Sequence, residues 1–181
     1  MVGLRLFVAV FLCGAMCAAP VVAQQRGWAR SPQVGVPKQA APVERSLLRL
    51  VNRERVLNRL KPLKVTPALT FVARRHCANM CVAGVPAYES KRFPTGWTTT
   101  TERMKLVKLD RLSEIVGVST EGEASLKQRA AAIFEAWLHD PGTRKRFLAA
   151  DVLYGGAGAY TCGAQGVFMT LSVAKKPGRV P

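Results

Sequence analysis

Apolar residues recur at helical spacing in the part of the chain that follows residue 42. The first stripe begins at Val43, and Pro62 indicates that its helix ends just before that residue. Thr66 and Pro67 are typical of a helix start, because Thr caps free N–H groups and Pro fits the first helical turn. A second amphipathic helix is therefore predicted from there to about Ala83.

Beyond this point, Gly and Pro residues interrupt the pattern. Thr99 and Glu102 have the spacing of a capping box and predict one short helix. A strong apolar stripe then predicts a helix over residues 126–139, and Asp140 and Pro141 are typical of the start of another short helix.

Two β-rich runs close the pattern, Val152–Thr161 and Gly166–Ala174. The intervening CGAQ is typical of a turn, so the pair is predicted to form a hairpin. We expect the glycines of GGAGAYTCG to serve packing or turns rather than to bind phosphate. Helices that precede a hairpin favour an α+β fold over a parallel α/β array.

The N-terminus is predicted to be a signal peptide. Arg5 precedes the uncharged apolar run Leu6–Ala19, which is too short to span a bilayer but has the length of a signal-peptide core. Cleavage is expected before Gln24. The alternatives are a retained membrane anchor and lipidation at Cys13 or Cys17.

Four segments are predicted from these patterns. A signal peptide spans residues 1–23, and a basic linker rich in Pro and Gly spans residues 24–40. One domain of α+β type spans residues 41–174, and a loose basic tail spans residues 175–181.

Signal cleavage would leave three cysteines, Cys77, Cys81 and Cys162. Cys77 and Cys81 share one helix face, which is unfavourable for a bond between them, whereas either one could reach Cys162. The other interpretation, slightly favoured by the pattern, is that they are buried small apolar side chains. No Cys or His pair with zinc spacing accompanies them.

The chain is strongly basic, with 27 Lys and Arg against 11 Asp and Glu in 181 residues. Cleavage before Gln24 would leave 26 basic residues and a charge of +15. The richest segment, Arg45–Lys64, holds seven basic residues. Such a charge attracts polyanions. Export disfavours nucleic acid, so an anionic lipid surface, an acidic glycan or a cell-wall polymer is the expected partner; the alternative is a basic surface that serves only solubility.

Three ordered motifs resemble the CAP superfamily, in particular its bacterial SCP-like secreted domains. The first is LLRLVNRERVLNRLKPLKVTPALTFVARRHCANM, the second is AWLHDPGTRKRFL, and the third is the closing hairpin with VFMTLSVA. Together they span about residues 44–174. The resemblance implies an α-β-α sandwich with a small, mostly antiparallel sheet and a cleft.

In many CAP proteins that cleft holds two His and two acidic residues able to bind a divalent metal. Glu114 matches one acidic position, whereas Thr143 stands where the second His is expected and no His matches the first. His76 and His139, the only histidines, match neither position; we expect His76 to be a hydrogen-bonded core residue and His139 to lie at a helix end. Glu114 is interpreted either as a cleft carboxylate or as a helix-end or surface charge.

The cleft candidates are therefore Glu114, Thr143, Arg144 and His76, and no catalytic residue, metal or cofactor is expected. One aligned carboxylate is too few ligands for zinc. The sequence favours a secreted or cell-envelope CAP-domain protein that binds without catalysis. The alternative is a CAP-type metal-dependent hydrolase with a relocated site.

Overall fold

The computed structural model describes residues 40–89, 98–120 and 125–181. The predicted signal peptide and nearly all of the predicted linker lie outside these residues. The described helices are α2 (Ala40–Leu57), α3 (Pro67–Ala83), α4 (Thr100–Leu106), α5 (Leu126–His139) and α6 (Pro141–Phe147). The strands are β1 (Lys64–Val65), β2 (Ser113–Ser119), β3 (Tyr154–Thr161) and β4 (Val167–Ala174).

The helix starts follow the predicted capping residues. Thr66 accepts a hydrogen bond from the Leu69 N–H at the start of α3, and Thr99 with Glu102 forms a capping box on α4. Asp140 caps α6 by accepting from the Thr143 N–H. These local signals therefore set where the helices begin.

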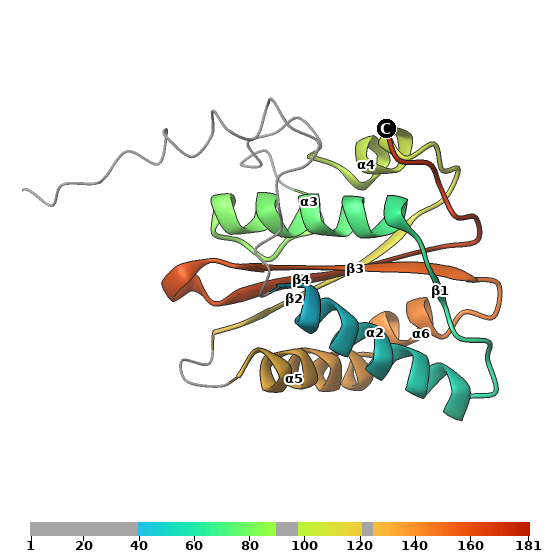
Figure 1. The fold of residues 1–181 in the computed structure, drawn as a ribbon, viewed down its shortest axis with the longest axis horizontal. Coiled ribbons are helices and arrows are strands. Elements are labelled where there is room, and N and C mark those ends of the chain that lie inside the picture. Colours follow the sequence, from blue (N-terminus) through green and yellow to red (C-terminus); the bar gives the residue numbers. More distant parts are fainter. Residues whose placement is uncertain (1–39, 90–97, 121–124) are drawn as a thin grey trace, which may run out of the picture.

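The strands form a single sheet in the order β1-β3-β4-β2. The two-residue β1 runs parallel to β3, and all other pairings are antiparallel, including the predicted β3–β4 hairpin. Helices α3 and α4 lie on one side of the sheet, and α2, α5 and α6 lie on the other (Figure 1). The α-β-α sandwich predicted from the resemblance is confirmed.

Two glycines let α3 pack closely on β3. A Cβ atom at Gly156 or Gly158 would overlap the α3 backbone at Thr70 and at Ala73, respectively. Their expected packing role is confirmed. On the other face, the largest apolar cluster joins α2, α5 and the sheet, with Leu47, Val51, Ile133, Trp137 and Leu171 among its members.

Strand β2 was not predicted from the sequence. It pairs along its whole length with β4, with Glu114 opposite Ser172. The interpretation of Glu114 as a helix-end or surface charge is therefore wrong, because Glu114 lies within a strand and is only 3% exposed.

The C-terminal tail is attached to the domain, so the expectation of a loose tail is wrong. The Thr66 hydroxyl donates to the Pro177 carbonyl at 3.0 Å, and the Arg179 N–H donates to the Val107 carbonyl at 2.8 Å. Lys176 also pairs with Asp110 at 2.7 Å. These bonds place the tail across the start of α3 and the end of α4.

A disulfide joins Cys81 to Cys162, whose Cα atoms are 5.6 Å apart. It ties the end of α3 to the β3–β4 turn. The slightly favoured view that the cysteines act only as buried apolar side chains is wrong for this pair. Cys77 is a buried thiol whose pKa is raised by burial, and it donates to the Thr170 hydroxyl at 3.3 Å.

No helix among the described residues is both long enough and apolar enough to cross a bilayer.

Candidate functional site

Glu114 forms a buried ion pair with Arg103. Both side chains are fully buried, Glu114 on β2 and Arg103 on α4. The Arg103 Nε lies 3.0 Å from each carboxylate oxygen, and its Nη2 lies 2.6 Å from Oε2. The same Nη2 donates to the Tyr88 carbonyl at 2.6 Å. The guanidinium therefore engages both oxygens of the carboxylate.

His76 contacts the carboxylate from α3. Its Nδ1 lies 3.5 Å from Glu114 Oε1, and its Nε2 donates to the Ala87 carbonyl at 2.9 Å. Burial opposes ionisation of Glu114, but its interactions with His76 and Arg103 hold the pKa of the carboxyl below its ordinary value. The expectation that His76 is a hydrogen-bonded core residue is confirmed.

Arg146 of α6 completes this group of residues. Its Nη1 donates to the Glu114 carbonyl at 3.2 Å, and its guanidinium lies 5.1 Å from the centre of the Tyr88 ring. We call His76, Tyr88, Arg103, Glu114 and Arg146 the Glu114 cluster. It joins α3, α4, β2, α6 and the segment after α3, so five parts of the chain meet around Glu114.

The cluster does not fit a divalent metal. Zinc takes three or four His, Cys or carboxylate ligands, and no three such side chains converge within the described part of the chain. Glu114 and His76 supply two candidate ligands, and the cationic Arg103 already occupies both carboxylate oxygens. The carboxylate is thus neutralised by the protein itself.

The other two sequence candidates lie on α6, away from the carboxylate. The Thr143 N–H donates to Asp140 at 2.5 Å, as part of the helix cap. Arg144 points toward α2, where it pairs with Glu54 at 3.1 Å. The structure therefore brings His76 and Glu114 together and gives Thr143 and Arg144 other contacts.

Sequence reasoning missed Arg103, Tyr88 and Arg146. Arg103 sits in a helix of seven residues, which is too short to show an apolar face. Arg146 lies two positions after Arg144, the residue that the motif singled out. A buried carboxylate needs a cation, and that requirement was the one available signal that such a partner existed.

Comparison with known families decides the classification. The model of the CAP family, described as the cysteine-rich secretory protein family, matches residues 48–173, which is well over half of the chain. The chain belongs to the CAP superfamily. No curated protein sequence matches it significantly.

Solved structures share the CAP fold with this chain. An extracellular protein containing an SCP domain from Bacillus anthracis is 19% identical with a TM-score of 0.62, and the match covers 76% of this chain and 41% of that one. An outer surface protein from Borrelia burgdorferi is 15% identical with a TM-score of 0.59, and the match covers 77% of this chain and 94% of that one. A cysteine-rich secretory protein from Staphylococcus aureus is 18% identical with a TM-score of 0.55, and the match covers 77% of this chain and 40% of that one. This chain thus spans about two fifths of the Bacillus and Staphylococcus chains.

In this CAP domain the residues of the first motif are structural. Arg55 is fully buried and donates to the carbonyls of Lys61, Phe147, Ala149 and Val152 at 2.5–3.2 Å. It joins the turn after α2 to the segment between α6 and β3, so it is unavailable to an external anion.

Asn52 fixes the Pro-Leu step of the same motif. Its side-chain oxygen accepts from the Leu63 N–H at 2.8 Å, and its amide donates to the Leu63 carbonyl at 3.4 Å. The segment that leads from α2 into β1 is therefore held against the helix.

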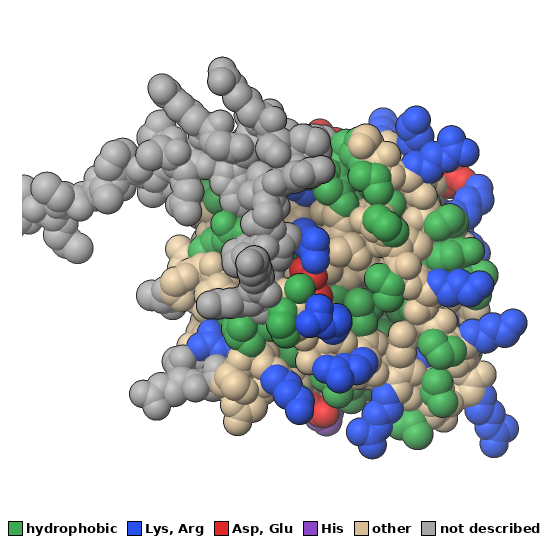
Figure 2. All heavy atoms as spheres, viewed as in Figure 1, with side chains coloured by type: hydrophobic (Ala, Val, Ile, Leu, Met, Phe, Trp, Pro, Cys, Tyr) green, Lys and Arg blue, Asp and Glu red, His purple; other side chains and the backbone are tan. Residues whose placement is uncertain are grey.

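Basic side chains dominate the visible face of this CAP domain. Figure 2 shows many Lys and Arg side chains along its lower and right-hand margins, with few Asp or Glu and with apolar side chains between them. The charge seen in the sequence is therefore displayed on the surface, whereas the Glu114 carboxylate is enclosed.

Proposed function

We propose that this CAP-domain protein acts outside the cytoplasm, at the cell envelope or beyond it, and binds an anionic surface without catalysing a reaction. The observation that carries the proposal is the engagement of both Glu114 oxygens by Arg103. A buried carboxylate whose two oxygens are both bonded to a guanidinium is poorly suited to hold a metal or to take up a proton from a substrate.

The net charge supports the second part of the proposal. The chain carries a formal charge of +16, and the basic side chains on the visible face have few acidic neighbours (Figure 2). A field of one sign concentrates ligands of the opposite sign and accelerates their encounter with the protein. The partner is then expected to be polyanionic.

The place of action rests on the N-terminal sequence pattern. The run Leu6–Ala19 and the small residues that follow it are typical of a signal peptide. Two structurally similar proteins are described as extracellular and as an outer surface protein. Mass spectrometry of the exported protein is expected to find Gln24 at the N-terminus, and an intact Met1 in the membrane fraction would contradict cleavage of a signal peptide.

Binding is tested with purified protein against anionic vesicles, acidic glycans and cell-wall fragments at two salt concentrations. Screening acts over about 8 Å at physiological ionic strength, so binding should weaken strongly as salt rises. Binding that ignores salt, or no binding to any of these probes, would defeat the proposal.

A metal-dependent CAP hydrolase with a relocated site is not favoured by any specific observation among the described residues. It would need three convergent ligands, and the described residues contain no such set.

A further inference from the structure

A groove runs between α2 and the segment Pro62–Val65, and its volume is about 720 Å³. Three of its lining side chains are large, apolar and strongly exposed: Val56 at 56%, Leu57 at 68% and Val65 at 57%. They account for half of the exposed large apolar side chains among the described residues. Clustered exposure of this kind marks an interaction surface.

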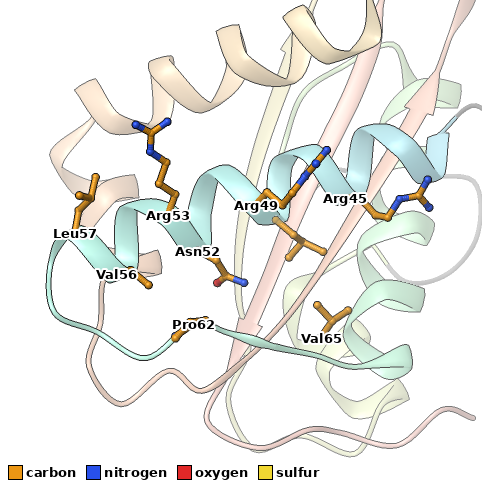
Figure 3. A pocket seen from close by; sticks show the side chains of 9 residues that line it. Arg45, Arg49, Asn52, Arg53, Val56, Leu57, Pro62 and Val65 are labelled. Carbon is orange, nitrogen blue, oxygen red and sulfur yellow. The ribbon is translucent and has the colours of Figure 1, made fainter.

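Three arginines line the same groove. Arg45, Arg49 and Arg53 are exposed and recur at every fourth position of α2, which spreads their side chains over about 12 Å of helix. Figure 3 shows them leaving successive turns of α2, with Asn52 and Val56 pointing toward Pro62. Within the described residues none of the three has a carboxylate at ion-pair distance, although Arg49 donates to the Ser46 hydroxyl at 3.1 Å.

The two carboxylates of α2 point elsewhere. Glu44 pairs with Arg74 of α3 at 2.6 Å and also accepts from the Ala159 N–H. Glu54 pairs with Arg144 of α6. Neither carboxylate forms an ion pair with the arginines of the groove, so the positive charge there is available to a ligand.

The walls of the groove are rigidly held. Arg55 fixes the turn after α2 through the Lys61 carbonyl, and Asn52 bonds to both the N–H and the carbonyl of Leu63. A surface that is already ordered loses little conformational entropy when it binds. The apolar and basic side chains of the groove are therefore carried by a backbone that is ordered before binding.

We propose that this groove docks the protein on an anionic phospholipid bilayer, with the arginines at the phosphate level and Val56, Leu57 and Val65 against the acyl boundary. Basic side chains beside exposed apolar ones are the pattern that anionic bilayer surfaces recognise. A soluble polyanion would leave the apolar residues unexplained. A second copy of the chain would bring two positive surfaces together. The inference rests on the proposed function and gives it a location and a ligand class.

The test compares charge-reversed variants by vesicle flotation. Vesicles of phosphatidylcholine with phosphatidylglycerol are compared with vesicles of phosphatidylcholine alone. Arg49→Glu/Arg53→Glu should weaken partitioning into the anionic vesicles at least roughly 30-fold. Lys105→Glu/Lys108→Glu changes the net charge equally, within α4 and just after its end, and α4 lies on the opposite side of the sheet (Figure 1); this variant should change partitioning much less.

A second pair of variants tests the apolar contribution. Val56→Gln/Leu57→Gln should weaken partitioning roughly tenfold, because burial of these side chains is lost. Val180→Gln is the matched control, since Val180 is a comparably exposed apolar residue (51%) in the C-terminal tail. Circular dichroism of each variant confirms that it is folded.

The outcomes separate this inference from the proposed function. Equal loss in the two charge-reversed variants, or no loss in Val56→Gln/Leu57→Gln, would overturn the docking surface while salt-sensitive binding to anions stood. Binding to heparin or to cell-wall polymers without binding to anionic vesicles would also overturn the docking surface and leave the proposed function standing. No binding to any anionic probe would overturn both.

Discussion

Replacing Arg103 by Met is expected to lower the free energy of unfolding by about 3–5 kcal/mol. The change keeps an unbranched side chain of similar length but removes the cation that neutralises Glu114. Both side chains of the pair are fully buried, so solvent cannot compensate the carboxylate.

The magnitude follows from the contacts. Arg103 places three N–O contacts of 2.6–3.0 Å on Glu114 and one of 2.6 Å on the Tyr88 carbonyl. A hydrogen bond to a charged group contributes about 1.5–3 kcal/mol to stability. An exposed ion pair contributes only about 0–1 kcal/mol, and removing one partner of a buried pair costs more than that. The expected loss lies well outside the range for a surface pair.

Urea unfolding of the oxidised protein at neutral pH measures this loss. Glu114→Gln alone should also destabilise, because it leaves the Arg103 charge buried without its partner. The double variant Arg103→Met/Glu114→Gln should lose clearly less than the sum of the two single changes. An Arg103→Met loss below about 1 kcal/mol, or losses that add, would refute the view that the pair is a tightly coupled buried unit.

Three further predictions concern stability. Because the pKa of Glu114 is lower in the folded state, its ionised form stabilises the fold above about pH 4.3, and this contribution is lost as the pH falls through the folded pKa. Urea midpoints should therefore fall less steeply between pH 6 and pH 3 in Glu114→Gln than in the original protein, and parallel slopes would contradict this. Arg55→Met should lower stability by about 3 kcal/mol in thermal unfolding, whereas Arg53→Met should stay within about 0.5 kcal/mol; equal losses would show that Arg55 is not a buried anchor. Reduction of the Cys81–Cys162 bond should cost about 2–4 kcal/mol, and an unchanged melting temperature under reductant would contradict its contribution.

Local signals predicted most of the helices and the hairpin. The caps at Thr66, Thr99 and Asp140 lie within the sequence windows that they control, so each helix start could be read directly. Strand β2 escaped detection because helices cover both faces of the sheet. Its residues therefore show no alternation of buried and exposed positions, and one of its few buried residues is a glutamate, Glu114.

The Glu114 cluster depends on contacts that no short window contains. Glu114 and His76 were individual candidates, but Arg103, the cation that pairs with Glu114, reaches the carboxylate only when α4 and β2 have packed. On α6 the motif pointed to Arg144, whereas Arg146 reaches Glu114. Two residues are about 200° apart around a helix, so these two side chains leave α6 in nearly opposite directions.

Zinc titration of the purified domain by isothermal calorimetry tests the central claim most directly. The claim is that the Glu114 carboxylate is already bound by Arg103 and His76, so that the protein works through its basic surface. The account predicts no stoichiometric zinc binding and no zinc retained after dialysis. About one equivalent of tightly bound zinc, lost in Glu114→Gln, would contradict the account and would make the Glu114 cluster the functional site.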